Sequence, residues 1–78
     1  MQKKTKKFLE LCALRQRCEL LQSDMAKIIG CSLSNYGAKE RGDTPFTLDE
    51  CVSIKNAINK KLEKMGKEKL SLEDIFLR

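Results

Sequence analysis

Hydrophobic residues recur at steps of three and four along most of this chain of 78 residues, a spacing typical of helices that bury one face. No run of Val, Ile or Thr alternates with polar residues as a half-buried β-strand would. The pattern therefore predicts an all-α fold, with five helices in a single domain that covers residues 1–78.

Glycines and capping residues set the expected ends of these helices. Gly30, Gly42 and Gly66 each follow a periodic segment, where a residue in the left-handed conformation commonly ends a helix. Ser32 is a good N-cap, and Thr47 and Ser71 each open a capping box whose acidic residue lies three positions later. The predicted helices cover residues 4–18, 22–29, 33–41, 48–65 and 72–77.

The same periodicity predicts which side chains the helices bury. In chain order the set is Phe8, Leu11, Cys12, Leu14, Cys18, Met25, Ala26, Ile29, Leu48, Cys51, Val52, Ala57, Ile58, Leu62, Met65, Ile75 and Phe76. Ile54 falls near the edge of the stripe on the fourth helix. We expect Tyr36 to pack with its hydroxyl at the edge of the core.

The helices at 22–29 and 33–41 are short and are joined by Gly30-Cys31-Ser32, which is a helix-turn-helix pattern. Ala26 is small enough for the two helices to cross closely, and Gly30 permits the sharp turn between them. Ser32 caps the second helix, whose N-terminal side chains would meet base edges in a DNA-binding protein.

The sequence resembles the Cro and C1 repressor-type helix-turn-helix family from about residue 11 to residue 58, and again over residues 71–76. The residues that carry the resemblance are Leu11, Leu14, Arg15, Leu20, Gln22, Met25, Ala26, Ile29, Gly30, Cys31, Ser32, Glu40, Arg41 and Gly42. The resemblance implies a five-helix lambda-repressor-like domain that binds double-stranded DNA as a two-fold homodimer, with half-sites about 34 Å apart.

The resemblance also implies roles for individual positions. Gln22, Arg41 and Gly42 correspond to phosphate contacts, and Arg15 with Glu40 corresponds to a partly buried ion pair between the first and third helices. The positions that correspond to the major-groove face are Leu33, Ser34, Gly37 and Ala38.

Three residues of this region are candidates on their own chemistry. Ser34 and Asn35 carry groups that can donate to bases or phosphates, although small polar residues also simply favour the start of a helix. Lys27, with Arg41 and the lysines within residues 3–7, would have to track the phosphates of a bound duplex.

Several positions depart from the family pattern. Leu21 stands where a Ser or Thr cap is usual, and Lys39 fills an apolar position from which its stem would have to snorkel. The groove-facing set contains no Arg, Gln or Asn for bidentate base contacts. Gly37, in the middle of a helix, costs about 1 kcal/mol relative to Ala.

Residues 59–70 form a longer connection than the family uses between its last two helices. If residues 59–65 are helical, they extend the fourth helix by about 10 Å. The apolar face of this extension either adds to the core of a small domain or contacts a second copy. The candidate dimer interface consists of Leu62, Met65, Ile75 and Phe76.

Charge does not follow the motif. The chain carries 16 Lys plus Arg against 11 Asp plus Glu, a net charge of +5 that favours an anionic partner. Residues 1–20 carry +4 and residues 55–78 carry +3, whereas residues 21–54 carry −2. The predicted helix-turn-helix is therefore the acidic part of a basic chain.

Other chemistry is poorly represented. The chain has no His, no phosphate-cradling Gly-rich loop and no paired carboxylates suited to a cleft, so we expect no enzyme activity, cofactor or metal. The four cysteines lack a C-x-x-C spacing and are expected to be partly buried thiols. Neither a secretory signal nor a membrane span is recognisable, and the expected compartment is the cytoplasm.

Two functions stay open at this point. The first is a sequence-specific DNA-binding transcriptional regulator from a phage or mobile element, which inserts the helix at 33–41 into the major groove. The second is a protein-interaction module, a modulator or antirepressor that binds a partner repressor through the same fold. The helix-turn-helix pattern, the family resemblance and the net positive charge favour the first, which is the leading hypothesis. The acidic helix-turn-helix and the long fourth helix favour the second.

Overall fold

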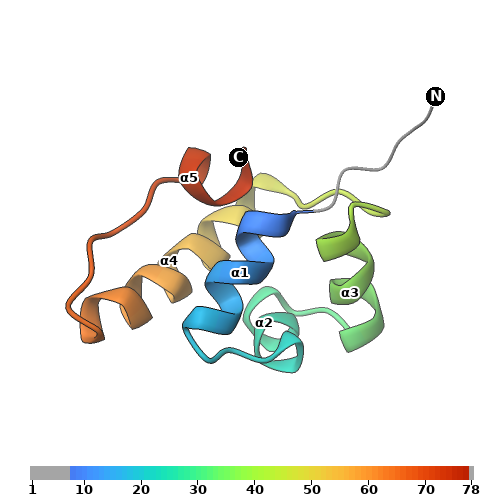
Figure 1. Ribbon diagram of the computed structural model, residues 1–78. Coiled ribbons are helices and arrows are strands. Elements are labelled where there is room, and N and C mark those ends of the chain that lie inside the picture. Colours follow the sequence, from blue (N-terminus) through green and yellow to red (C-terminus); the bar gives the residue numbers. More distant parts are fainter. Residues whose placement is uncertain (1–7, 78) are drawn as a thin grey trace.

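The computed structural model describes residues 8–77, which form five α-helices and no strand (Figure 1). In chain order the helices are α1 (Leu9–Arg17), α2 (Gln22–Ile29), α3 (Leu33–Arg41), α4 (Leu48–Lys64) and α5 (Leu72–Phe76). The predicted all-α class is confirmed. None of the described helices is long and apolar enough to cross a membrane.

The largest difference from the predicted boundaries is at the start of α1. Phe8 has non-helical backbone angles (φ −85°, ψ 77°), and its amide donates to the carbonyl of Glu40 at 3.1 Å. The helix therefore begins at Leu9 and not at residue 4. Residues 4–7 of the predicted helix, and the lysines of residues 3–7, lie outside the described residues. The predicted ends of the other helices agree with the structure to within one residue.

The predicted caps are present. Ser32 accepts a hydrogen bond from the amide of Asn35 at 3.1 Å, and Gly30 and Gly42 end α2 and α3 in the left-handed conformation, with φ of 75° and 89°. Leu21 has no side-chain oxygen with which to cap α2. Instead its own amide donates to the Asp24 carboxylate at 2.8 Å, which is only one half of a capping box.

The core lies between α1, α2, α4 and α5, and α3, which packs on α2, adds Tyr36 to it. The buried residues of α4 are Ile54, Ile58 and Leu62, which are spaced four residues apart along one face. The prediction that Ile54 sits near the edge of this stripe is wrong, because its side chain is fully buried. Leu48 and Val52, which were expected inside, are 71% and 37% exposed.

The connection after α4 returns to the core through one side chain. The amide nitrogen of the Asn59 side chain donates to the carbonyl of Leu70 at 2.9 Å, and its oxygen accepts from the Leu70 amide at 2.7 Å. This clamp precedes α5, whose Ile75 and Phe76 are buried, with the Phe76 ring edge-on to the rings of Phe8 and Phe46.

This arrangement corrects the expected dimer interface. Leu62, Ile75 and Phe76 are 3%, 1% and 6% exposed within a single copy of the chain. They belong to the core, so they cannot contact a second copy without opening the fold. Met65, the fourth residue of that set, caps the end of α4 and is 43% exposed.

Candidate nucleic-acid interface

The turn between α2 and α3 is built from small and left-handed residues. Ala26 of α2 is only 4% exposed, and its carbonyl accepts a hydrogen bond from the amide of Cys31 at 2.9 Å across the turn. Gly30 supplies the positive φ that this turn needs. The result is two short helices in contact, with the N-terminal turn of α3 directly after the tight turn.

That N-terminal turn is the exposed part of α3. Leu33, Ser34 and Asn35 are all exposed, Leu33 at 54%. Ala38 is half-buried one turn later. The sequence therefore places four of its candidate contact residues on accessible surface of one short helix.

Gly37 does not belong with them. It is buried, and a Cβ built on it would lie 3.3 Å from Nη1 of Arg41 and 3.9 Å from Oε1 of Gln22. These two side chains cover the glycine, so the expectation that Gly37 faces the major groove is corrected. Its smallness instead lets Arg41 fold back toward α2.

Three polar side chains, one each from α1, α2 and α3, donate to the carboxylate of Glu40 and tie these helices together. Arg15 donates to it through Nε at 2.9 Å and Nη2 at 3.2 Å, Gln22 through Nε2 at 2.8 Å, and Tyr36 through its hydroxyl at 2.8 Å. The structure thus contains the ion pair expected between Arg15 and Glu40. Gln22, expected at a phosphate, is half-buried and already engaged by this cluster.

The Tyr36 hydroxyl lies inside the core and not at its edge, since the whole residue is fully buried. Burial and the adjacent Glu40 carboxylate raise the pKa of this phenol, so it remains a hydrogen-bond donor. Burial alone would raise the pKa of Glu40, but the hydrogen bonds from Arg15, Gln22 and Tyr36 outweigh it and hold this pKa below its usual value.

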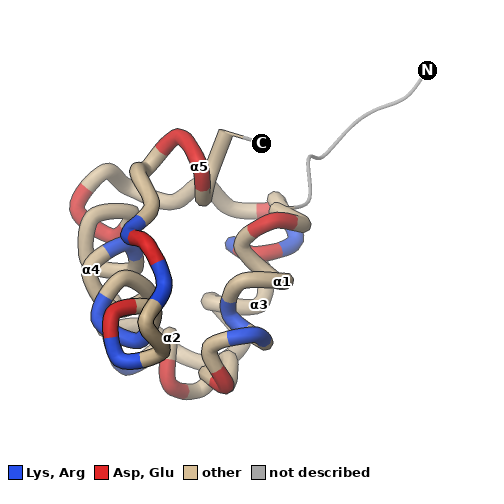
Figure 2. The backbone as a smooth tube through the Cα atoms, turned by 60° about the vertical axis from the view of Figure 1, so that its left-hand side comes forward, with Lys and Arg blue, Asp and Glu red and all other residues tan. Residues whose placement is uncertain are grey.

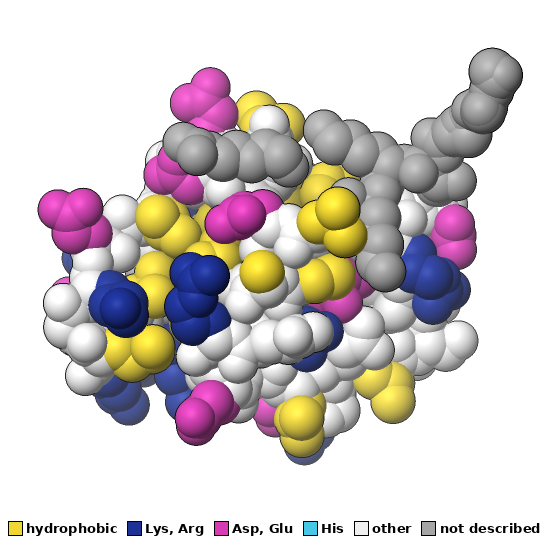
Figure 3. Space-filling view, viewed as in Figure 1, with side chains coloured by type: hydrophobic (Ala, Val, Ile, Leu, Met, Phe, Trp, Pro, Cys, Tyr) yellow, Lys and Arg dark blue, Asp and Glu magenta, His cyan; other side chains and the backbone are white. Residues whose placement is uncertain are grey.

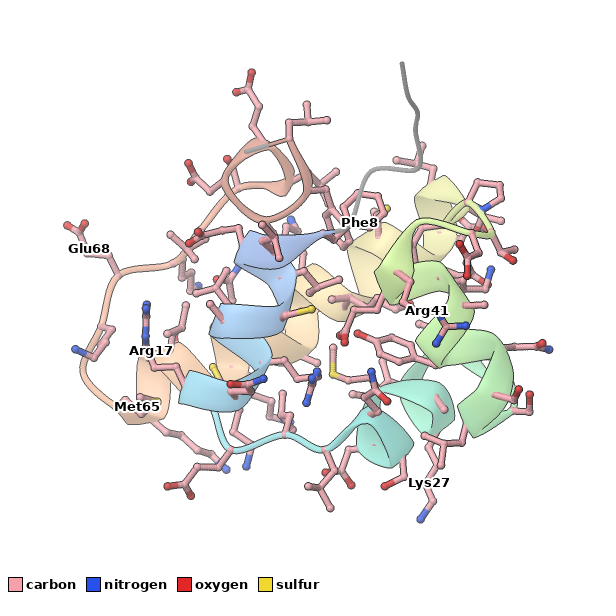
Figure 4. All side chains as sticks on the ribbon, turned by 45° about the vertical axis from the view of Figure 1, so that its right-hand side comes forward. Phe8, Arg17, Lys27, Arg41, Met65 and Glu68 are labelled. Atoms are coloured by element: carbon pink, nitrogen blue, oxygen red, sulfur yellow. The ribbon has the colours of Figure 1, made fainter. Side chains whose placement is uncertain are left out.

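Most cations of the helix-turn-helix are already paired with carboxylates. Lys39 is only 9% exposed and donates to Glu50 at 2.9 Å and to the carbonyl of Pro45 at 3.1 Å, so its stem does not snorkel to solvent as expected. Arg41 pairs with Asp43 at 3.1 Å on the surface. Lys27, on α2, is exposed, and Figure 4 shows it on the same side of the molecule as Arg41.

A groove adjoins this surface that the sequence did not indicate. It encloses about 530 Å³ between α1, the start of α2 and the end of α3. Ala13 and Gln16 of α1 line it together with Gln22 and Arg41. Ala13 and Gln16 are exposed because they lie off the buried stripe of α1. That position in the helix was the only indication in the sequence that these two residues could line a groove.

Comparisons of this chain with protein-family models, with curated proteins and with solved structures found no match.

Proposed function

We propose that the protein is a sequence-specific regulator that binds double-stranded DNA by placing the N-terminal turn of α3 in the major groove, in the manner of a Cro/C1-type, lambda-repressor-like domain. The observation that carries the proposal is the geometry of α2 and α3. A tight left-handed turn at Gly30 joins them, and the exposed turn of α3 bears polar side chains.

The exposed side chains of α3 offer a small set of base contacts. An α-helix about 10–12 Å across fits a major groove about 12 Å wide. Asn35 has the paired donor and acceptor that match the N6 and N7 edge of adenine, Ser34 can contact several bases, and Leu33 can meet the methyl group of thymine. The proposed half-site is therefore one that offers adenine and thymine edges to these three side chains.

Arg41 supplies the phosphate contact next to these residues in this proposal. It is 60% exposed as a side chain, and Asp43 holds it at 3.1 Å. An ion pair this exposed contributes about 1 kcal/mol or less, so a phosphate can displace the carboxylate. Lys27 would add a second phosphate contact from α2.

Selection from a pool of random duplexes tests the proposal. We expect one palindrome to be enriched, bound by two copies related by a two-fold axis. Asn35→Ala and Ser34→Ala should each relax the preference at one base pair by about 1–3 kcal/mol. Arg41→Ala should weaken all sequences alike and lower the salt slope by about one.

Asp43→Asn provides the matched control for Arg41. This variant releases the arginine, and it should therefore bind the selected palindrome more tightly and with a steeper salt dependence. The proposal fails if no sequence is enriched, or if selected binding is indifferent to both Ser34→Ala and Asn35→Ala.

The surface chemistry of the same helices favours a second candidate function. Leu21 and Leu33, at the starts of α2 and α3, are 65% and 54% exposed, and the cations Arg15, Lys39 and Arg41 are neutralised by carboxylates. Such a surface suits a partner repressor protein. Under this candidate, Leu33→Ser removes co-purification of the repressor, and enrichment of a palindrome without any such capture excludes it.

A further inference from the structure

Lysines are concentrated on α4 and the segment that follows it, away from α3. Residues 55–69 contain six lysines and two glutamates. Figure 2 shows these blue positions along α4 and the segment that follows it. Within residues 8–77 only one of the six, Lys69, forms an ion pair, with Glu63 at 3.6 Å. This distribution is the reverse of that in the helix-turn-helix.

Part of this charge converges on one hollow, which we call the basic notch. It has a volume of about 270 Å³ where the end of α1 meets the last turns of α4, and Arg17, Lys61 and Lys64 line it with Cys18, Glu19 and Met65. Three cations therefore face a single carboxylate. In Figure 4, Arg17 and Met65 lie at one end of the molecule, and Lys27 and Arg41 at the other.

Two observations show that these side chains surround the same space. Figure 3 shows Lys and Arg side chains around exposed apolar atoms over the ends of α1 and α4. Arg17 and Lys61 line the notch together with Cys18, whose pKa is raised by burial, while the charges of the two cations oppose that rise. The notch is thus an electropositive depression with a buried floor.

We propose that the basic notch binds the phosphate backbone of duplex DNA, independently of sequence, and supplies most of the salt-dependent affinity of this protein. The hollow is smaller than the roughly 300 Å³ at which pockets for drug-sized molecules begin, but it is open and lined by point charges that suit a phosphate group. Duplex DNA presents about one such charge per 1.7 Å of its axis. The proposal does not depend on α3 reading bases.

The fold contains a matched control for this surface on the same helix. Lys55 and Lys60 line a separate hollow on the other flank of α4, so Lys55→Gln/Lys60→Gln changes the net charge as much as Lys61→Gln/Lys64→Gln does. The affinity of both double variants and of the wild type for a random-sequence duplex of 20 base pairs would be measured by fluorescence anisotropy between about 50 and 200 mM salt.

We expect the Lys61/Lys64 variant to lose about 1.8 from the slope of log affinity against log salt, since each lost phosphate contact removes about 0.9. Between about 50 and 200 mM salt, the factor by which affinity falls should therefore be about 12 times larger for the wild type than for this variant. The Lys55/Lys60 variant should keep a slope near that of the wild type. In NMR spectra of the wild type, the duplex should shift the amides of residues 17–19 and 61–65.

Equal slopes for the two double variants would overturn the proposal, because overall charge would then explain the binding. So would the absence of any duplex binding by the wild type at 50 mM salt, or displacement of the duplex by polyglutamate at the same charge concentration as competing DNA. Because the duplex has random sequence, these outcomes are separate from those of the palindrome selection, and either proposal can fail while the other stands.

Discussion

Replacing Glu40 by Ala should destabilise this protein more than any change on its surface. Glu40 is 3% exposed, and its carboxylate accepts two hydrogen bonds from Arg15, one from Gln22 and one from Tyr36. Its removal leaves the buried guanidinium without its counter-ion, with only the carbonyl of Leu20 as acceptor, and the buried Tyr36 hydroxyl without Glu40. Breaking one half of a buried pair costs roughly 3–5 kcal/mol, and a domain of this length has only about 4–12 kcal/mol of stability.

Thermal and urea unfolding followed by circular dichroism would measure this loss. For a domain of this size, 3 kcal/mol corresponds to a fall in Tm of about 12–24 °C. Glu63→Ala is the matched control, since Glu63 pairs with Lys69 at 3.6 Å with both side chains about two-thirds exposed. That pair should contribute less than about 1 kcal/mol.

A double-mutant cycle between Arg15→Met and Glu40→Met separates the ion pair from the other contacts of the carboxylate. Replacing both charges by apolar groups of similar size leaves no charge buried alone, so the double variant should lose about 1–3 kcal/mol less than the sum of the single variants. If the two losses add to within about 0.5 kcal/mol, the reasoning from an uncompensated buried charge is wrong.

Three further predictions follow from single contacts. The folded state holds the pKa of Glu40 below its ordinary value of about 4.3. The stability that the ionised carboxylate contributes is therefore complete above about pH 4.3 and is lost as the pH falls through the lowered pKa. The urea midpoint should fall on acidification, and it should fall less in Glu40→Gln. Leu21→Ser should raise the Tm, because a serine N-cap adds about 1 kcal/mol of stability to α2, whereas Leu33→Ser, one residue past a cap, should not raise it. Asn59→Ala should cost about 1–3 kcal/mol and speed proteolysis of residues 65–71, with the exposed Asn56→Ala as control.

Local chemistry made most of the fold predictable from the sequence. The caps at Ser32, Thr47 and Ser71 and the glycines after the helices act within four residues of their own position, so the helix ends could be predicted almost to the residue. The start of α1 could not, because Phe8 leaves helical geometry to bond the carbonyl of Glu40, 32 positions away.

The side on which a helix is buried was less predictable than its ends. On α4 the apolar residues Leu48 and Val52 suggested a stripe with Ile54 near its edge, but packing against α2 and α5 centred the buried face on Ile54, Ile58 and Leu62. Leu62, Ile75 and Phe76 were ambiguous between core and interface for the same reason. Periodicity gives the width of an apolar face and not what covers it.

The candidate site shows a similar division between local and distant causes. The exposed residues at the start of α3 follow from its cap and its phase, and their positions were predicted. The burial of Gly37 and the engagement of Gln22 depend on long side chains, Arg41 and Glu40, that reach across from other turns and helices. Lys39 of α3 donates to Glu50 of α4, and a contact between two helices cannot be predicted from the spacing within either one.

Under our proposals, the residues that contact bases lie on α3, whereas most unpaired charge of the described chain lies elsewhere, and this affects how the protein would select a DNA site. Affinity from phosphate contacts falls steeply with salt, whereas discrimination between bases depends on short hydrogen bonds and apolar contacts that salt screens weakly. Here Arg15, Lys39 and Arg41 are paired with carboxylates near α3, and Arg17, Lys61 and Lys64 lie at the opposite end without such partners in the described chain. Where one duplex contacts both the notch and α3, a rise in salt would therefore weaken specific and non-specific complexes by a similar factor. The ratio between them would be set by the contacts of Ser34 and Asn35 and would change little.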